Sequence, residues 1–453
     1  TEDGIIGKDL CGIVAGDINI NAGSDGVKST YDTDTTKGNV IIEGGNITIK
    51  ASNDGIQAEN ILVINDGTIN IKTNNGAADT TQTHIDNMDM GRGGFGFNNN
   101  KTTTTTDDTS ESRKGIKAGN MLIINDGDIT IDSDDDSVHC NSVIYIYGGT
   151  INAATGDDGV HADDLLTVNG GTINITQCYE GLEADDIVIN DGDISVVSSD
   201  DGINSSDGSI TINGGNLLIN ASGDGLDANG SIIINGGYIV VLGPTSDGDT
   251  AIDYDDSCTI NGGTVMAFGS SGMLEIPKGA SNGACIVTAF TSVSGGSKYT
   301  LSDSNGNEIL SYTPSKAYAA AIVYSDKITT GNTYNITAGS TTLSIEVTSD
   351  VTSNVSSGFG GAGGMNKPGN GGSGMPNNGS SDNGMGNGNS NGSMPDMLGN
   401  GAPDMNGNSS GDMPSMGGNS SNNGGNMPNM NNGSSNGLSL IHISEPTRHS
   451  LIS

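Results

Sequence analysis

The stretch "DDGVHADDLLTVNGGTINI", residues 157–175, carries four aspartates within eight positions and then a run of strand-forming residues. It reads as three short strands at residues 159–162, 165–168 and 172–175, because apolar and polar residues alternate in each run. An Asn-Gly-Gly turn at residues 169–171 precedes the third run, and glycine permits the positive φ angles that tight turns need. The stretch therefore predicts one coil built from three short strands.

Relatives of this stretch recur along the chain at a nearly constant spacing. Turns of the same kind follow nine apolar runs, and they begin at Glu43, Asn65, Asn125, Tyr147, Asn169, Asn190, Asn213, Asn235 and Asn261. Most neighbouring copies are about 22 residues apart, and the one long interval contains an insertion. A strand repeat of this length, without helical spacing, is typical of a β-solenoid. The turn asparagines should stack as a hydrogen-bonded ladder.

Composition divides the chain into four parts. We expect a solenoid at residues 1–275, with a flexible Gly-, Asn- and Thr-rich loop inserted at residues 75–113. Residues 276–350 lose the period and predict a small β cap domain, which would cover the unpaired strand edges of the last coil. Residues 351–436 are Gly-, Asn-, Ser- and Met-rich and predict a disordered tail. Residues 437–453 resemble translated sequencing-adapter sequence, so we expect them to be an artefact.

The charge of the chain narrows the class of partner. A net charge of −38, with 54 acidic and 16 basic residues, argues against nucleic acid and favours cations, or a polyanion bridged by cations. No apolar run is long enough to span a membrane as a helix. The five cysteines follow no metal-binding spacing and are interpreted as small buried residues. The chain opens at Thr1 in mid-pattern, so we expect a signal peptide to have been lost and the protein to be extracellular or at the cell surface. We also expect a monomer.

Acidic residues fall at the same phase of successive coils between about residues 157 and 256. Equal phases of a solenoid lie about 4.8 Å apart, where two ionised carboxylates repel by roughly 3 kcal/mol. Either the pKa values rise or cations lie between the coils, and oxygen ligands of this kind suit calcium. The predicted calcium ligands form one cluster of Asp158, Asp163, Glu183, Asp185 and Asp201, and a second of Asp224, Asp227, Asp253 and Asp255. The alternative is a solvated acidic face that keeps the protein soluble.

Three cationic or neutral residues occupy the outward column of the first strand, at Lys117, His139 and His161. They are candidate carbohydrate contacts. The two histidines also fit a transition-metal site, although neighbouring surface histidines are more often plain polar residues.

The coils of the form "DGIxA" followed by "INGGxIxI", the Gly-rich insertion and the segment "SDSNGNEILSYTPSKAYAAAIVYS" together resemble the bacterial carbohydrate-binding β-helix family. The resemblance covers about residues 1–350. The characterised clostridial member of that family binds cellulose and pectic polygalacturonate. The resemblance implies a right-handed parallel β-helix similar to that of pectate lyases, bound calcium, an extracellular location and no demonstrated catalysis.

The sequence therefore predicts a non-catalytic polysaccharide-binding protein for acidic, polygalacturonate-like polymers or for cellulosic plant polymers. A calcium-dependent polysaccharide lyase is the first alternative. It needs a base near the calcium, yet residues 134–256 contain no Lys or Arg, and Lys117 lies two coils before Asp163. A surface adhesin stiffened by calcium is the second alternative, and the sequence does not separate it from a sugar binder.

Overall fold

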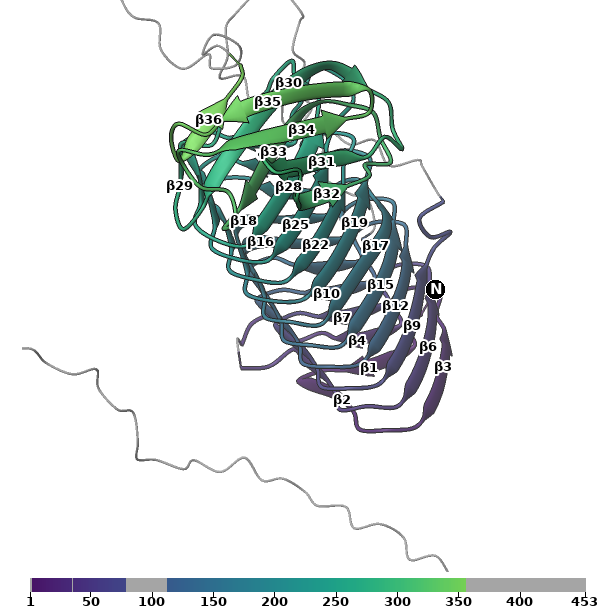
Figure 1. The fold of residues 1–453 in the computed structure, drawn as a ribbon. Coiled ribbons are helices and arrows are strands. Elements are labelled where there is room, and N and C mark those ends of the chain that lie inside the picture. Colours follow the sequence, from purple (N-terminus) through teal and green to yellow (C-terminus); the bar gives the residue numbers. More distant parts are fainter. Residues whose placement is uncertain (1, 35, 79–111, 356–453) are drawn as a thin grey trace, which may run out of the picture. The chain divides into compact units, whose positions relative to one another are not determined.

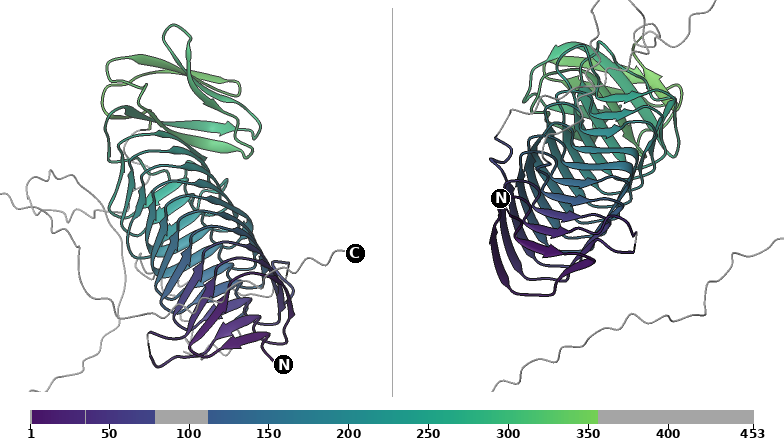
Figure 2. Two further views of the ribbon diagram at one scale, coloured as in Figure 1. Left: turned by 90° about the horizontal axis from the view of Figure 1, so that it is seen from below. Right: turned by 180° about the vertical axis from the view of Figure 1, so that it is seen from behind.

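The computed structural model of the chain describes residues 2–34, 36–78 and 112–355. In these ranges the secondary structure is all β, and no helix is present. Successive coils stack along one axis, as Figures 1 and 2 show. The predicted all-β solenoid is confirmed. None of the described segments forms a helix of the length and apolarity that a membrane crossing requires.

Each coil contributes its first two strands to a 19-stranded sheet, here called sheet A. The first strands of the coils are β1 (Ile5–Gly7), β4 (Val27–Ser29), β7 (Ile56–Ala58), β10 (Ile116–Ala118), β13 (Val138–Cys140), β20 (Ile203–Ser205), β23 (Leu226–Ala228) and β26 (Ile252–Tyr254). The second strands are β2 (Leu10–Ile13), β5 (Asn39–Ile42), β8 (Ile61–Ile64), β11 (Met121–Ile124), β14 (Val143–Ile146), β21 (Ile210–Ile212), β24 (Ser231–Ile234), β27 (Ser257–Ile260) and β29 (Gly279–Ala280). In two coils both strands merge, giving β16 (Val160–Val168) and β18 (Leu182–Ile189).

The third strands begin a 13-stranded sheet, here called sheet B. They are β3 (Asp17–Asn21), β6 (Asn46–Ala51), β9 (Thr68–Thr73), β12 (Asp128–Ser133), β15 (Thr150–Thr155), β17 (Thr172–Cys178), β19 (Asp193–Ser198), β22 (Asn216–Asn220), β25 (Tyr238–Leu242) and β28 (Thr264–Gly269). In the opening stretch the third run is thus the start of β17, whereas the first two runs form the single strand β16.

The pairing is parallel and keeps the predicted spacing. Ile116 of one coil pairs with Val138, Val138 with Val160, and Val160 with Leu182, each 22 residues further along the chain. All four side chains are buried, because alternation along a strand sends every second residue into the core. Aliphatic side chains from both sheets therefore form one continuous core along the solenoid.

The predicted asparagine ladder is confirmed at the turn before the third strand. The side-chain amide of Asn213 donates to Asn190 at 2.8 Å, that of Asn235 to Asn213 at 2.8 Å, and that of Asn261 to Asn235 at 3.0 Å. A similar bond of 2.7 Å joins Asn125 to Asn65 across the insertion. The ladder holds successive coils in the same register.

After the last coils the chain reverses direction. The C-terminal strands are β30 (Ala284–Val293), β31 (Tyr299–Asp303), β32 (Glu308–Tyr312), β33 (Tyr318–Ser325), β34 (Thr333–Ala338), β35 (Thr341–Glu346) and β36 (Val351–Ser353). Strand β33 pairs antiparallel with β28 and with β30, which extends sheet B. Strands β31, β32, β34 and β35 form a separate antiparallel sheet, and Val240, Met266 and Phe268 pack in one core with Tyr299 and Ile336.

Several sequence predictions concern residues that the structure does not describe. The inserted loop lies outside the described residues from 79 to 111, and so do the tail from residue 356 onwards and the adapter-like segment. The division into domains therefore stays a prediction. The cysteines are described, and all five are buried and free.

Candidate metal centre and acidic face

A column of acidic side chains precedes the first strand of the coils, and it has a structural role. One carboxylate oxygen accepts a hydrogen bond from the backbone N–H of the equivalent residue in the next coil. This bond joins Asp25 to Asp54 at 3.1 Å, Asp136 to Asp158 at 3.1 Å, Asp158 to Glu180 at 3.1 Å and Asp201 to Asp224 at 2.6 Å. We call this column the acid ladder; it consists of Asp25, Asp54, Asp136, Asp158, Glu180, Asp201 and Asp224. Much of the recurring acid therefore satisfies backbone donors, and the second oxygen is left for other partners.

Cationic side chains neutralise the N-terminal part of the acid ladder. Lys28 forms a 2.7 Å ion pair with Asp25. Lys114 takes the position of an acid in the ladder and lies 2.6 Å from Asp136 and 2.9 Å from Asp135. Burial alone would raise the pKa of Asp136, but the charge of Lys114 and a bond from His139 hold it well below the usual range.

The sequence pattern of an acidic residue followed by glycine misses both residues: Ser137 follows Asp136 in place of the glycine, and Lys114 precedes Gly115 but is not acidic. The constant spacing of 22 residues from Lys114 to Asp136 to Asp158 would have found both residues.

His161 lies at the centre of the first predicted cluster. Its Nδ1 atom lies 3.1 Å from Glu183 Oε2, 3.3 Å from Asp158 Oδ2 and 3.8 Å from Asp136 Oδ2. Its Nε2 atom lies 3.6 Å from Asp163 Oδ1. Burial lowers the pKa of His161, yet the bond to Asp158 and the charges of Asp136 and Glu183 outweigh it and raise the pKa to about 10.

His139 lies in the coil before His161, and the two rings meet edge to face with centroids 4.9 Å apart. Its Nδ1 atom lies 2.8 Å from Asp136 Oδ2, and its Nε2 atom lies 2.9 Å from Asn141 Oδ1. Lys117 occupies the same column one coil earlier and donates to Ser112 at 3.1 Å. The three predicted carbohydrate contacts therefore share one column and lie beside the acid ladder.

After His161 the outward column of the first strands becomes mainly acidic. The column that carries His161 continues with Glu183, Asn204, Asp227 and Asp253, paired in register. Residues 134–256 contain no Lys or Arg. Burial, with mutual repulsion adding to it, raises the pKa of Glu180 to about 9, Glu183 to about 8, Asp201 to about 8, Asp224 to about 9 and Asp227 to about 7. Among the described residues, none of these five carboxylates forms an ion pair with a Lys or Arg side chain, and only Glu183 pairs with a histidine, His161.

Four groups of the described residues could each hold a metal ion; two of them, Asp136 with His139 and His161 and Asp135 with Asp136 and Asp157, include the carboxylate that Lys114 neutralises. The other two lie further along the acidic face. Asp201, Asp224 and Asp227 bring one oxygen each to within 4.8 Å of one another, and Asp158, His161 and Glu183 do the same with two oxygens and a nitrogen. Oxygen ligands of one calcium ion, bound at 2.3–2.6 Å, lie at most about 5 Å apart. The group that contains Asp201 therefore fits calcium, and water molecules would complete its coordination.

The grouping differs in part from the predicted clusters. Asp201 lies with Asp224 and Asp227, although the sequence pattern assigned it to the cluster of Glu183. Asp185 accepts a 3.1 Å hydrogen bond from the hydroxyl of Ser206. The charges of Asp253 and Asp255 both raise the pKa of Asp227, after burial, so these two residues lie within electrostatic reach of the second cluster.

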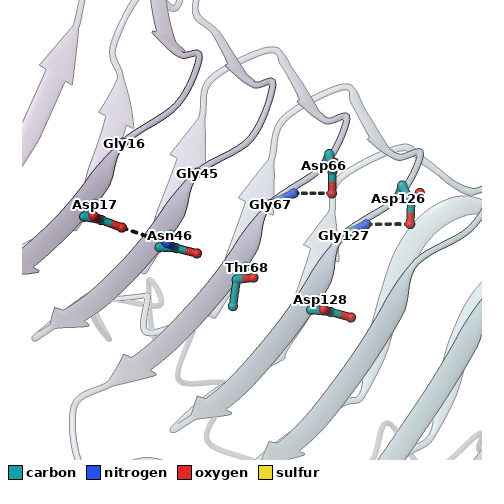
Figure 3. A pocket seen from close by; sticks show the side chains of 10 residues that line it. All are labelled: Gly16, Asp17, Gly45, Asn46, Asp66, Gly67, Thr68, Asp126, Gly127 and Asp128. Atoms are coloured by element: carbon teal, nitrogen blue, oxygen red, sulfur yellow. Dashed lines mark hydrogen bonds between the residues drawn. The ribbon is translucent and has the colours of Figure 1, made fainter. Parts of the chain in front are cut away.

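A shallow depression of about 440 Å³ lies at a different corner of the coil, at the turn before the third strand. Figure 3 shows its lining from four coils, including Asp17, Asn46, Thr68 and Asp128. Asp66 bonds its own turn, because its carboxylate accepts the N–H of Gly67 at 2.7 Å. None of the candidate metal groups found among the described residues includes a residue that lines this depression.

Comparison with known proteins supports a binding role. The family described as carbohydrate-binding domain-containing protein matches residues 1–159 and 157–270, which is more than half of the chain. No curated protein and no solved structure matches the chain. The acidic parallel solenoid, taken together with this match, assigns the chain to the family of carbohydrate-binding domain-containing proteins.

Proposed function

We propose that the chain is an extracellular, non-catalytic protein that binds acidic, polygalacturonate-like polysaccharides through calcium held on its acidic face. The family match supports a polysaccharide partner. The finer assignment rests on one observation, the carboxylate group of Asp201, Asp224 and Asp227. Residues 134–256 contain no lysine or arginine, so a bound calcium ion would offset the burial and the repulsion that otherwise raise the pKa values of these three carboxyl groups.

An acidic polymer fits this face better than a neutral one. Calcium that is bound by three carboxylates retains coordination positions for further oxygens, and the carboxylates of a uronate chain can fill them. A neutral glucan is held mainly by stacking on aromatic rings, and the chain has no Trp. Tyr147 and Tyr238 are the exposed tyrosines of the described solenoid coils, at 52% and 45% exposure. Cellulose is the second candidate because of these two rings.

A polysaccharide lyase is the catalytic alternative. It would need a base that takes the proton next to the uronate carboxylate. The two lysines that precede the acidic coils are both engaged: Lys117 donates a hydrogen bond to Ser112, and Lys114 forms ion pairs with Asp135 and Asp136. This engagement favours binding over elimination.

The test is retention of the chain on insoluble polygalacturonate and on cellulose, each with calcium and with a chelator. We expect retention on polygalacturonate that requires calcium, with no rise in the ultraviolet absorbance that unsaturated uronates produce. A rise in that absorbance would establish the lyase. Retention on cellulose that is unchanged by the chelator would indicate binding by aromatic stacking and not by calcium bridging. No retention on either polymer would contradict the proposal and leave a calcium-stiffened adhesin.

A further inference from the structure

His161 is surrounded by carboxylates in a way that calcium binding does not explain. Asp158 and Glu183 face its Nδ1 atom at 3.3 and 3.1 Å, and Asp163 faces its Nε2 atom at 3.6 Å. The side chains of Asp158 and Glu183 are 10% and 20% exposed and that of His161 is 25% exposed. The two atoms nearest to Nδ1 thus come from different coils and converge on one half-buried nitrogen.

The spacing of these atoms matches the ligand shell of a small divalent metal. Ligand atoms at the corners of a tetrahedron, each about 2.0–2.1 Å from zinc, lie about 3.3 Å apart. The distances from His161 Nδ1 to the two carboxylates are close to this value, and all three ligand atoms lie within 4.8 Å of one another. A nitrogen donor also changes the preferred ion, since calcium takes oxygen ligands and imidazole suits zinc, cobalt and nickel.

Asp163 supplies an independent indication. A histidine that binds a metal through one ring nitrogen usually directs the other toward a carboxylate, which orients the ring. Asp163 Oδ1, on the same strand β16, lies 3.6 Å from His161 Nε2, just beyond hydrogen-bond distance, so a small side-chain rotation would complete such a bond.

The neighbouring group of Asp136, His139 and His161 is a weaker candidate. Lys114 lies 2.6 Å from Asp136 Oδ2, the oxygen that also faces His139. A metal ion there would meet the positive charge of Lys114. Among the described residues no Lys or Arg pairs with Glu183, and the cation beside it is His161 itself, whose proton a bound metal ion would displace.

We propose that Asp158, His161 and Glu183 bind a borderline divalent metal of the zinc class, with Asp163 orienting the histidine. The site is separate from the calcium group at Asp201, Asp224 and Asp227, and it does not depend on polysaccharide binding. One water molecule would complete a tetrahedral shell. The ion would cross-link two adjacent coils on the acidic face.

The test is calorimetric titration of the metal-stripped chain with zinc, in the presence of excess calcium. Cobalt serves as a second probe, because the intensity of its visible absorption distinguishes a tetrahedral site from an octahedral one. We expect His161→Gln and Glu183→Gln each to weaken zinc binding by about 100-fold or more, since loss of a supporting residue alone typically costs 10–100-fold. Asp163→Asn should cost about tenfold.

His139→Gln is the matched control, because it removes an adjacent imidazole that binds Asp136 instead. It should change zinc affinity by less than the Asp163→Asn variant does. His84, His442 and His449 are retained in every variant, so any zinc that they bind is common to all. Thermal melts of the metal-stripped variants identify any that fail to fold. If His161→Gln or Glu183→Gln does not fold, the cobalt spectrum of Asp163→Asn is compared with that of the parent, and an altered spectrum supports the site.

Zinc affinity that is unchanged in His161→Gln would overturn the proposal. So would an equal loss in His139→Gln, which would place the metal at Asp136. Displacement of the zinc by calcium would also overturn it, because the nitrogen donor would then have no effect on selectivity. None of these results bears on calcium-dependent retention by polygalacturonate, which depends on the other group.

Discussion

At the scale of single residues, Glu180 illustrates how a buried carboxyl group of the acidic face lowers the stability of the fold when it ionises. Burial raises its pKa to about 9, the charges of Glu183 and Asp158 add to the rise, and a 2.8 Å hydrogen bond from Asn204 opposes it. A carboxyl group with a raised pKa binds its proton more tightly in the folded state. Its contribution to stability is therefore complete below about pH 4 and is lost as the pH rises toward 9.

Glu180→Gln should remove this loss. In the presence of chelator we expect the variant to be more stable than the parent at pH 8, by at least the roughly 1.4 kcal/mol that corresponds to one pKa unit. At pH 4 the two proteins should be nearly equal, since Gln still accepts the bond from Asn204. Urea unfolding at the two pH values measures the difference. Glu346→Gln, at an exposed position of β35, is the control and should show no such dependence on pH.

Asp224 carries a similar penalty but also belongs to the proposed calcium group. Asp224→Asn keeps the oxygen that accepts the backbone N–H of Thr250 and removes the charge. With chelator the variant should melt higher than the parent, because burial raises the pKa of Asp224 to about 9 and ionisation is unfavourable there. With calcium the gain in melting temperature should shrink, since fewer charged ligands hold the ion.

Scanning calorimetry with chelator and with calcium measures both predicted differences in melting temperature. Asp128→Asn, on the exposed face of sheet B, is the matched control and should leave the calcium response unchanged. An equal response to calcium in the parent and in Asp224→Asn would exclude this group as the site.

At the scale of the coil, the glycine before the first strand is required by packing. A Cβ atom on Gly159 would lie 2.4 Å from Ile175 Cδ1 and 2.5 Å from the carbonyl oxygen of Gly181. Other coils repeat this pairing of a glycine with a β-branched residue, as in Gly55 with Ile71. The glycine is replaced in two coils, by Ser137 and by Ala251, and the corresponding partners there are Ala153 and Ala267. The chain thus compensates a larger residue at one position with a smaller one at the other.

Gly159→Ala should therefore destabilise the protein by about 1–3 kcal/mol, the usual cost of overpacking a core. Adding Ile175→Ala should cost less in the Gly159→Ala background than in the parent. We expect a coupling energy of about 1 kcal/mol from the double-mutant cycle. Denaturant unfolding of the four proteins measures it. Gly12→Ala is the control, because no atom lies within 4 Å of the added Cβ. Strict additivity would show that the backbone carbonyl alone limits the site.

At the scale of the whole molecule, charge is distributed unevenly along the solenoid. Lysines form ion pairs with the acid ladder in the first coils, whereas residues 134–256 contain no Lys or Arg. The outer face of sheet B is different again, with exposed Leu218 and Tyr238 beside polar positions. An acidic polymer and a neutral polymer would therefore bind to different faces.

Two variants separate these faces. Asp227→Asn should reduce calcium-dependent retention on polygalacturonate several-fold, because it weakens the ion that bridges protein and polymer. Tyr238→Ala should leave that retention unchanged and should lower retention on cellulose if stacking on this ring contributes. Sedimentation of each variant with both polymers gives the comparison. A larger loss on polygalacturonate for Tyr238→Ala than for Asp227→Asn would contradict calcium bridging.

The sequence by itself determined the solenoid, since a strand repeat of about 22 residues can bury its apolar side chains only by stacking on its neighbours. The same repeat determined which residues share a column, including the asparagine ladder and the acidic face. The merging of two predicted strands into β16 was not visible, because Asp163 and Asp164 resemble a turn and yet lie within the strand.

Only the tertiary structure decided which side chains of a column meet. It grouped Asp201 with Asp224, placed Lys114 against Asp136, and surrounded His161 with carboxylates from neighbouring coils. A repeat specifies the phase of each residue, but ligand groups depend on side-chain rotamers and on shifts between coils of an ångström or less. The family and the column were therefore readable from the sequence, whereas the grouping of side chains into candidate metal sites depends on the tertiary structure.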